Sequence, residues 1–295
     1  MPTQLIINAD DFGATSAINA AVIKTRLRGV LTSASLMVTG QAAAEAISIA
    51  KNDPGLAVGL HLALSQVRSA LPLHLIPGLV NNNSHFARSP IIAALNYYFN
   101  HKLRRELRLE IEAQFELFAK TGLTLSHVDG HQHLHTHPAV LPIVIELAQK
   151  YGAAGIRIPH DPLLANLHTN YSRLGSKLFV ALGHTYLAGV SRHLLRDSDF
   201  VRCDATIGSL MSGAMSDDYV IRMLRNMNCS SIEVFFHPTD LRDNEPGSDP
   251  YGPNAGDLRA LTSPRLKQFL ADNGYELTNY PGLKRKQVEA ASEHS

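Results

Sequence analysis

Two adjacent carboxylates lie near the start of the chain, in the run Asn8-Ala9-Asp10-Asp11-Phe12-Gly13. The short apolar run Leu5-Ile6-Ile7 precedes them and predicts a buried strand that ends in a loop. Parallel α/β proteins place their sites at the carboxyl ends of such strands. Because neighbouring side chains of an extended segment point to opposite sides, Asp10 and Asp11 can take different tasks, one holding a metal and the other moving a proton. A helix N-cap followed by a turn residue is the alternative for an isolated pair.

A dense group of histidines forms the second feature, in the run from His127 to Pro138 that reads HVDGHQHLHTHP. Imidazole is a common ligand of zinc and similar ions. Alternate residues of an extended segment share a face, so Asp129, His131 and His133 are expected to converge. The preceding Leu123-Thr124-Leu125 is strand-like, and Pro138 suits the first turn of a following helix. The pattern favours a metal site, with a solvated histidine-rich loop as the alternative.

Two single histidines end other short apolar runs. His61 follows Val58-Gly59-Leu60, and His237 follows the run from Ser231 to Phe236. A lone histidine on an apolar strand is more often a core residue than a ligand. Here four separate strand ends each supply an aspartate or a histidine, which favours one shared site.

The composition indicates a cytosolic enzyme. With 27 basic and 26 acidic residues, the chain has no overall charge that would attract nucleic acid. Cys203 and Cys229 form no close pair or metal motif. The expected strand starts almost at the N-terminus and leaves no room for a signal peptide, and no apolar run reaches the length of a membrane span.

Strands and helices alternate along the sequence, which predicts a largely parallel sheet with right-handed crossovers. We expect a single-domain α/β fold, a closed or slightly broken (β/α) barrel over residues 1–282, with a loose polar tail over 283–295. Helices are predicted from Ser16 to Gly29, Gln41 to Lys51, Leu103 to Gly122, Pro138 to Gly152 and Ser263 to Gly274. Residues 67–100 and 160–202 are too long for plain barrel loops and are predicted to be insertions that shape the substrate pocket, a structural lid or a dimer contact.

The motifs together resemble the YdjC-like carbohydrate deacetylases, the family of ChbG type. The resemblance rests on Asn-Ala-Asp-Asp-Phe-Gly, Gly-Leu-His-Leu, Asp-Gly-His-Gln-His-Leu-His and Glu-Val-Phe-Phe-His-Pro in this order, and it spans Leu5 to Tyr280. It implies a (β/α) barrel of the glycoside hydrolase/deacetylase type, distorted or seven-stranded. The segment Gly155 to Pro159 and the length are most similar to the hopanoid-biosynthesis branch called HpnK.

The resemblance also implies roles for individual residues. It assigns the metal to Asp11, His61 and His131, the general base to Asp10 and the general acid to His237. Further substrate-binding or supporting roles are expected of five residues: Glu233 to orient His237, Asp129 to orient His131, Arg157 to contact substrate, and His133 and His135 to line the pocket. The cofactor is one divalent ion, Mg²⁺ or Zn²⁺, with Mn²⁺ and Co²⁺ as further candidates. The sequence Asn254-Ala255-Gly256-Asp257-Leu258 stands where relatives often carry Arg-x-x-Glu-Leu.

The expected function is therefore metal-dependent removal of an acetyl group from an N-acetylated sugar. The substrate expected from the HpnK branch is N-acetylglucosaminyl bacteriohopanetetrol, and diacetylchitobiose is the alternative. A binuclear phosphoesterase or amidohydrolase and a sugar-binding or regulatory protein are the rival classes.

A soluble enzyme that acts on a glycolipid must meet it at a membrane surface. Residues 90–99 and 174–195 combine apolar and aromatic residues with flanking basic ones, as interfacial helices do. They predict a peripheral contact at the inner face of the membrane, with packing on the barrel or across a dimer as the alternative. The resemblance also implies a homodimer.

Overall fold

Parallel strands build the centre of the molecule. The computed structural model describes residues 2–87, 89–169, 174–241 and 252–292. The strands, in chain order, are β1 (Thr3–Phe12), β2 (Ser33–Leu36), β3 (Ala57–Leu62), β4 (His127–Gly130), β5 (Gly155–Ile156), β6 (Ala205–Ile207), β7 (Ser231–Phe236) and β8 (Tyr275–Thr278). Their order across the sheet is β5-β4-β3-β2-β1-β7-β6, and β8 pairs with β1 outside this path.

Strand β1 is the centre of the sheet because it pairs on both sides along its length. Its first half lies beside β8 and its second half beside β2, while β7 follows its other edge. The predicted strand residues Leu5, Ile6 and Ile7 are fully buried, as expected for a strand covered on both faces. All pairings are parallel, so the carboxyl ends of the strands meet at one rim.

The sheet curls toward a barrel without completing it. Its edge strands β5 and β6 are not ladder partners, but Gly155 forms an isolated parallel bridge with Val201. The hydroxyl of Thr206 in β6 also donates to the carbonyl of Ile158 just after β5, at 2.9 Å. The single-domain α/β fold with a slightly broken, seven-stranded (β/α) barrel is thus confirmed.

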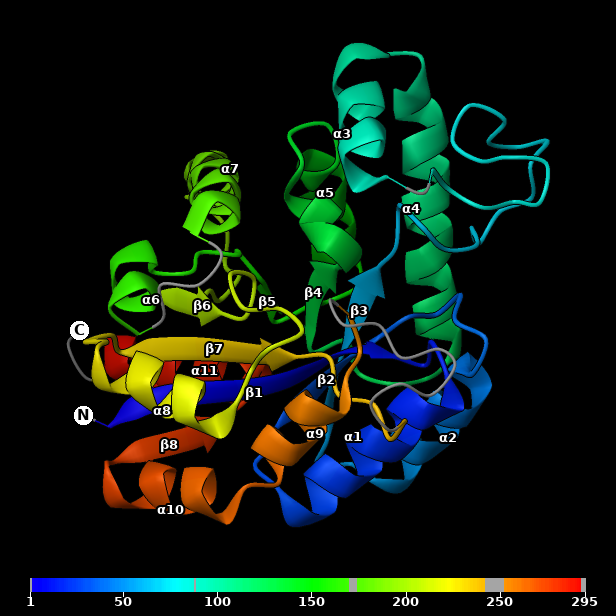
Figure 1. Cartoon of the computed structure of the whole chain (residues 1–295). Helices are drawn as coiled ribbons and strands as arrows, with labels where there is room; N and C mark the ends of the chain where they lie inside the picture. Colours follow the sequence, from blue (N-terminus) through cyan, green and yellow to red (C-terminus); the bar gives the residue numbers. More distant parts are fainter. Residues whose placement is uncertain (1, 88, 170–173, 242–251, 293–295) are drawn as a thin grey trace.

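Helices fill the connections between the strands (Figure 1). They are α1 (Ser16–Arg28), α2 (Ala43–Asn52), α3 (Pro90–Phe99), α4 (Leu103–Lys120), the 3₁₀ helix η1 (His131–Thr136), α5 (Leu141–Lys150), α6 (Leu163–Thr169), α7 (Leu174–Leu194), α8 (Asp217–Arg225), α9 (Ala255–Leu261), α10 (Pro264–Asp272) and α11 (Tyr280–Ser292). Local sequence sets several starts, because the side chains of Thr15, Ser89 and Ser263 accept backbone N–H groups at the first turns of α1, α3 and α10. The helix expected from Ser16 does begin there, and Thr15, the residue before it, is the cap.

The long connections before α4 and before β6 lie near η1, with α3 and α7 above the sheet and α6 beside β6 (Figure 1). The first holds a loop and α3, and the second holds α6 and α7, with residues 170–173 outside the described part (Figure 1). Helices α3 and α7 each contact η1. The first insertion is anchored to α4, where the buried carboxylate of Glu110 accepts the N–H groups of Ala70 and Leu71 at 2.8 and 2.9 Å.

Two segments differ from expectation. The helix expected from Pro138 begins at Leu141, because His137 still closes η1 by donating its N–H to Leu134. The tail expected to be loose forms α11 up to Ser292, since Tyr280 and Leu283 are buried in a small apolar cluster with Ile6 and Val201. Among the described residues, no helix is long and apolar enough to cross a membrane.

Candidate metal centre and catalytic site

A bulge at the end of β1 presents both aspartates to the rim. The register between β1 and β2 shifts between Ala9 and Phe12, and Asp11 adopts a left-handed backbone with φ of 61°. This conformation is costly for a residue with a Cβ and is common at functional sites. Asp10 and Asp11 each come within ligand range of His61, so the two carboxylates serve one centre rather than two opposite faces.

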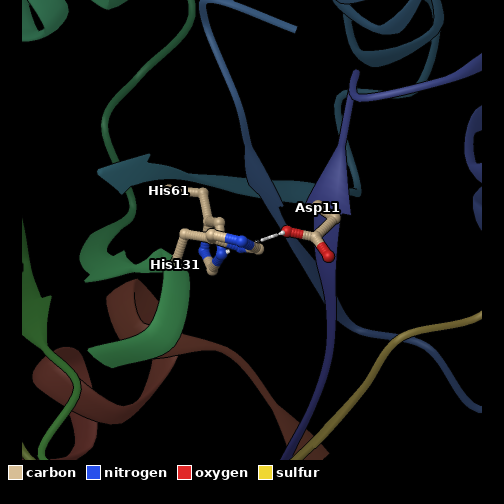
Figure 2. Close-up of side chains that lie close together, drawn as sticks. All are labelled: Asp11, His61 and His131. Atoms are coloured by element: carbon tan, nitrogen blue, oxygen red, sulfur yellow. Dashed lines mark hydrogen bonds and ion pairs between the residues drawn. The ribbon is translucent and has the colours of Figure 1, made fainter. Parts of the chain in front are cut away.

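Asp11, His61 and His131 converge from β1, β3 and the start of η1 (Figure 2). One atom from each lies within 4.8 Å of the others, a spacing that suits a metal ion. Asp11 Oδ1 is 3.3 Å from His61 Nε2 and 3.1 Å from His131 Nδ1. The three residues expected to bind the metal are thus brought together.

The protonation of His61 fits a metal ligand. Its Nδ1–H donates to Asp129 Oδ1 at 2.8 Å, and its buried Nε2 has no hydrogen-bond partner in the described chain. Metal-binding histidines are commonly held this way, with the second nitrogen donating to a carboxylate. Asp129 was expected to orient His131 but supports His61 instead, because β3 and β4 pair His61 directly with Asp129.

The electrostatics of the centre favour a cation. Burial alone would lower the pKa of His61, but Asp129, Asp11 and Asp10 outweigh burial and raise it to about 10. Burial would likewise raise the pKa of Asp11, yet His131 and His61 hold it well below its usual range. Several negative charges therefore surround Nε2 of His61, so the site favours a positive charge there, either the proton of the imidazole or a divalent metal that displaces it.

Arg157 lies behind the centre rather than at its mouth. This arginine was expected to contact substrate, but its side chain is fully buried. Its guanidinium donates to both oxygens of Asp10 at 2.7 and 2.8 Å, and it contacts Glu233 at 2.9 Å and Asp129 at 2.8 Å. Such a forked contact fixes the plane of a carboxylate, so Arg157 orients Asp10.

His237 is positioned by a residue that sequence reasoning missed. Its Nε2 lies 3.9 Å from Asp10 Oδ2, and its backbone N–H donates to Asp257 at 2.8 Å. Glu233 was expected to orient His237 but contacts Arg157 and accepts from Tyr280 at 2.7 Å. Asp257 belongs to the segment that departs from the family pattern. There the side chain of Asn254 caps α9 by accepting the backbone N–H of Asp257.

The remaining histidines do not share a face with Asp129. The chain leaves β4 and turns at once into η1, where Gln132 and His133 have positive φ. His133 Nε2 lies 3.2 Å from Ser209 Oγ, and His135 donates to the carbonyl of Arg157 at 2.9 Å. Burial lowers the pKa of His135 to about 4. Both side chains lie beside the centre, and neither belongs to a group of possible metal ligands among the described residues.

Asn8, Ser33 and Ser35 were also missed by sequence reasoning. Asn8 donates to Asp10 Oδ1 at 2.7 Å and to Ser35 at 2.8 Å, and Ser33 donates to Asn8. Ser35 in turn donates to Asp129 at 2.6 Å. Small polar residues on adjacent buried strands give little signal in a single sequence, although here they complete the hydrogen bonds of the two aspartates.

Known proteins share the sequence of this chain over most of its length. A model of the YdjC-like protein family matches residues 4–272. A carbohydrate deacetylase of Brevibacillus brevis is 30% identical over 286 residues, which cover 95% of this chain and 99% of the relative. A carbohydrate deacetylase of Vibrio cholerae is 40% identical over 284 residues, with 95% and 96% covered.

A solved structure gives the same result for the fold. An Enterococcus faecalis protein named for a proposed cellobiose-phosphate cleavage superimposes with a TM-score of 0.73 at 27% identity, covering 96% of this chain and 99% of that one. The site motifs occur in the family's order and meet at one rim, and the family model matches most of the chain. This chain belongs to the YdjC-like family.

Proposed function

We propose that this chain is a metal-dependent hydrolase that removes the acetyl group from an N-acetylated sugar. The observation that carries the proposal is the triad Asp11, His61 and His131 beside the pair Asp10 and His237. Relatives that match nearly the whole chain are carbohydrate deacetylases. An amide resists hydrolysis because its carbonyl is a poor electrophile and its amine is a poor leaving group. A metal held by the triad would address the first difficulty, and the acid His237 would address the second.

Asp11, His61 and His131 would hold one divalent ion, Mg²⁺ or Zn²⁺, or else Mn²⁺ or Co²⁺. Such an ion polarises an amide carbonyl and makes a nearby water more acidic. The protein side of the reaction then needs a base and an acid. Asp10, held in place by Arg157 and Asn8, takes a proton from the attacking water. His237 gives a proton to the nitrogen as the C–N bond breaks, which yields acetate and a free amine.

A single ion fits the centre better than two. A second group of possible ligands consists of Asp10, His61 and Asp129, but it shares His61 with the first. The guanidinium of Arg157 already neutralises Asp10 and Asp129, at 2.7 and 2.8 Å. A binuclear phosphoesterase would need that space for a second cation. Elemental analysis of the purified protein should therefore give about one metal per chain, and two would favour the rival class.

Acetate release tests the reaction directly. Purified protein loaded with each of the four metals is incubated with N-acetylglucosamine conjugates, and the products are acetate and an amine in equal amounts. Asp10→Asn provides the control, because it keeps the shape of the site but cannot accept the proton of water. Release that is equal in the wild type and this variant would contradict the proposal.

For the substrate, we infer a glycolipid, N-acetylglucosaminyl bacteriohopanetetrol, as in the HpnK branch. Support comes from α3, where Ile91, Ile92, Leu95 and Phe99 expose 61, 55, 52 and 73% of their surface. The exposed basic residues Lys102 and Arg104 follow. An apolar helix face flanked by basic residues suits an anionic lipid surface. The chain would then act in the cytoplasm at the inner face of the membrane. Diacetylchitobiose is the alternative, in agreement with the carbohydrate deacetylases among the relatives.

Liposome flotation separates these two substrates. Ile91→Ser/Leu95→Ser should reduce both binding to anionic liposomes and turnover of a hopanoid-linked substrate, while Leu27→Ser should not. Leu27 is a matched control, since it is 76% exposed on α1. Faster turnover of diacetylchitobiose without liposome binding would support the soluble substrate. Sedimentation of the same samples tests the homodimer, in which the apolar face of α3 would instead be covered by the second copy.

A further inference from the structure

The two ring nitrogens of His131 face different partners. Nδ1 lies 3.1 Å from Asp11 Oδ1, and Nε2 lies 3.0 Å from Gln66 Oε1. A neutral imidazole carries one proton, so it donates from one nitrogen and has a lone pair on the other. Which nitrogen carries the proton decides whether His131 can bind a cation next to Asp11. Gln66 is the group that can make this choice, because it contacts the nitrogen that points away from the centre.

An acceptor at Nε2 selects the metal-binding form. With Gln66 Oε1 accepting, the proton stays on Nε2, and the lone pair of Nδ1 faces the carboxylate of Asp11. Two electron-rich atoms then face each other, an arrangement that a cation stabilises. With a donor at Nε2, or with no partner there, Nδ1–H could instead donate to Asp11 and close the site. Histidine ligands are generally set in this way by the hydrogen bond of their second nitrogen.

The backbone that carries Gln66 is fixed by several other contacts. Gln114 of α4 donates to the carbonyl of Ala63 and accepts its N–H, at 2.8 and 3.0 Å. The buried hydroxyl of Tyr97 in α3 donates to the carbonyl of Leu64 at 2.7 Å. The N–H of Gln66 itself donates to Ala87 at 3.0 Å. Although Gln66 is exposed at the rim, its amide is presented to His131 from an anchored segment.

Backbone strain marks the same place. Five residues other than glycine in the described chain have positive φ, and four of them adjoin the centre: Asp11, Gln66, Gln132 and His133. Gln66 has a φ of 65°. A left-handed backbone at a residue with a long side chain persists only where other contacts maintain it. Here it occurs in the loop after β3, at the residue whose side chain reaches His131 at the start of η1.

We propose that Gln66 is a positioning residue that keeps the proton of His131 on Nε2, so that Nδ1 is free to bind the metal. The inference rests on the metal site of the proposed function. It also gives the first insertion a role, since the contacts of α3 and α4 that fix residues 63–66 would thereby set the affinity for the ion.

Zinc titration by calorimetry tests this inference. Gln66→Leu keeps the size of the side chain but removes the acceptor, and it should weaken Zn²⁺ binding by about 10–100-fold. Gln66→Glu can only accept at Nε2, so its affinity should equal or exceed that of the wild type. Gln132→Leu is the matched control, because Gln132 is an exposed neighbour of His131 with the same left-handed backbone, and its affinity should not change.

A correlation spectrum of the histidine ring nitrogens gives a readout that is independent of zinc. In the metal-free protein, the proton of His131 should lie on Nε2 in the wild type and in Gln66→Glu, and it should shift toward Nδ1 in Gln66→Leu, where Nδ1–H can donate to Asp11. The same proton distribution in all three proteins, or equal zinc affinity for Gln66→Leu and the wild type, would overturn the inference. His131→Ala separates this failure from a wrong metal site: if His131→Ala loses zinc while Gln66→Leu keeps it, only the role of Gln66 is wrong.

Discussion

The two halves of the centre differ in how their charged and polar groups are paired. In the ligand half, formed by Asp11, His61 and His131, one buried nitrogen lacks a partner and the backbone of Asp11 is left-handed. In the carboxylate half, formed by Asp10, Asp129 and Glu233, the guanidinium of Arg157 already lies among the three acids. The difference indicates where an added cation belongs. The ligand half offers imidazole nitrogens to a cation that can displace their protons, whereas the carboxylate half already contains the guanidinium of Arg157.

Removing a histidine from the ligand half should have the largest effect. His61→Ala or His131→Ala leaves two protein ligands, so the ion is weakly held and turnover is abolished. Metal content after dialysis and acetate release measure the two losses together. The exposed His74→Ala, in the loop of the first insertion, is the control and should retain both. Full metal content and activity in either ligand variant would show that the triad is not the metal site.

Removing the proton donor should lower the rate without emptying the site. His237→Ala is expected to reduce kcat by about 10²–10⁴-fold, the usual contribution of a positioned acid. With one general base and one general acid in the reaction, the wild-type rate should be bell-shaped in pH, because a general acid must be protonated to act. The variant should lose the alkaline decline. An unchanged pH profile would assign the acid to another residue.

Disrupting the carboxylate half should affect folding rather than metal binding. Arg157→Met leaves three buried carboxylates without their counter-charge, and loss of one partner from a buried charged group typically costs about 3–5 kcal/mol. The free energy of unfolding is measured by urea denaturation. Arg108→Met removes an exposed pair with Glu146 and should cost far less, because solvent screens exposed ion pairs. Equal losses in the two variants would mean that the buried network contributes little.

The smallest expected effect is at the far end of the same network. Tyr280→Phe keeps the ring stacked on His127 but removes the donor to Glu233, which should cost about 1.5–3 kcal/mol because the acceptor is charged. Tyr275→Phe is the control, since its hydroxyl donates to a neutral carbonyl, that of Leu224. Its loss should be about 0.5–1.5 kcal/mol. A larger loss in the control would argue that Glu233 does not depend on Tyr280.

The sequence predicted the fold and the convergence of the site well, and for a definite reason. Parallel strands align their carboxyl ends, so residues at the ends of apolar runs, such as Asp11 and His61, must lie at one rim. The partners of each side chain could not be predicted in the same way. Asp129 supports His61 because of the register of β3 and β4. Arg157 lies inside because, just after β5, its guanidinium meets carboxylates from β1, β4 and β7. The helical turn after Gly130 was missed since alternation of residue types cannot reveal a positive φ at His133.

The most direct test of the account compares the two neighbouring aspartates, one in each half. Metal titration of Asp10→Asn should give nearly the affinity of the wild type, although acetate release is lost, because the amide cannot accept the proton of water. Asp11→Asn should instead weaken metal binding itself. If Asp10→Asn loses the metal while Asp11→Asn retains it, the assignment of ligand and base to the two halves is reversed.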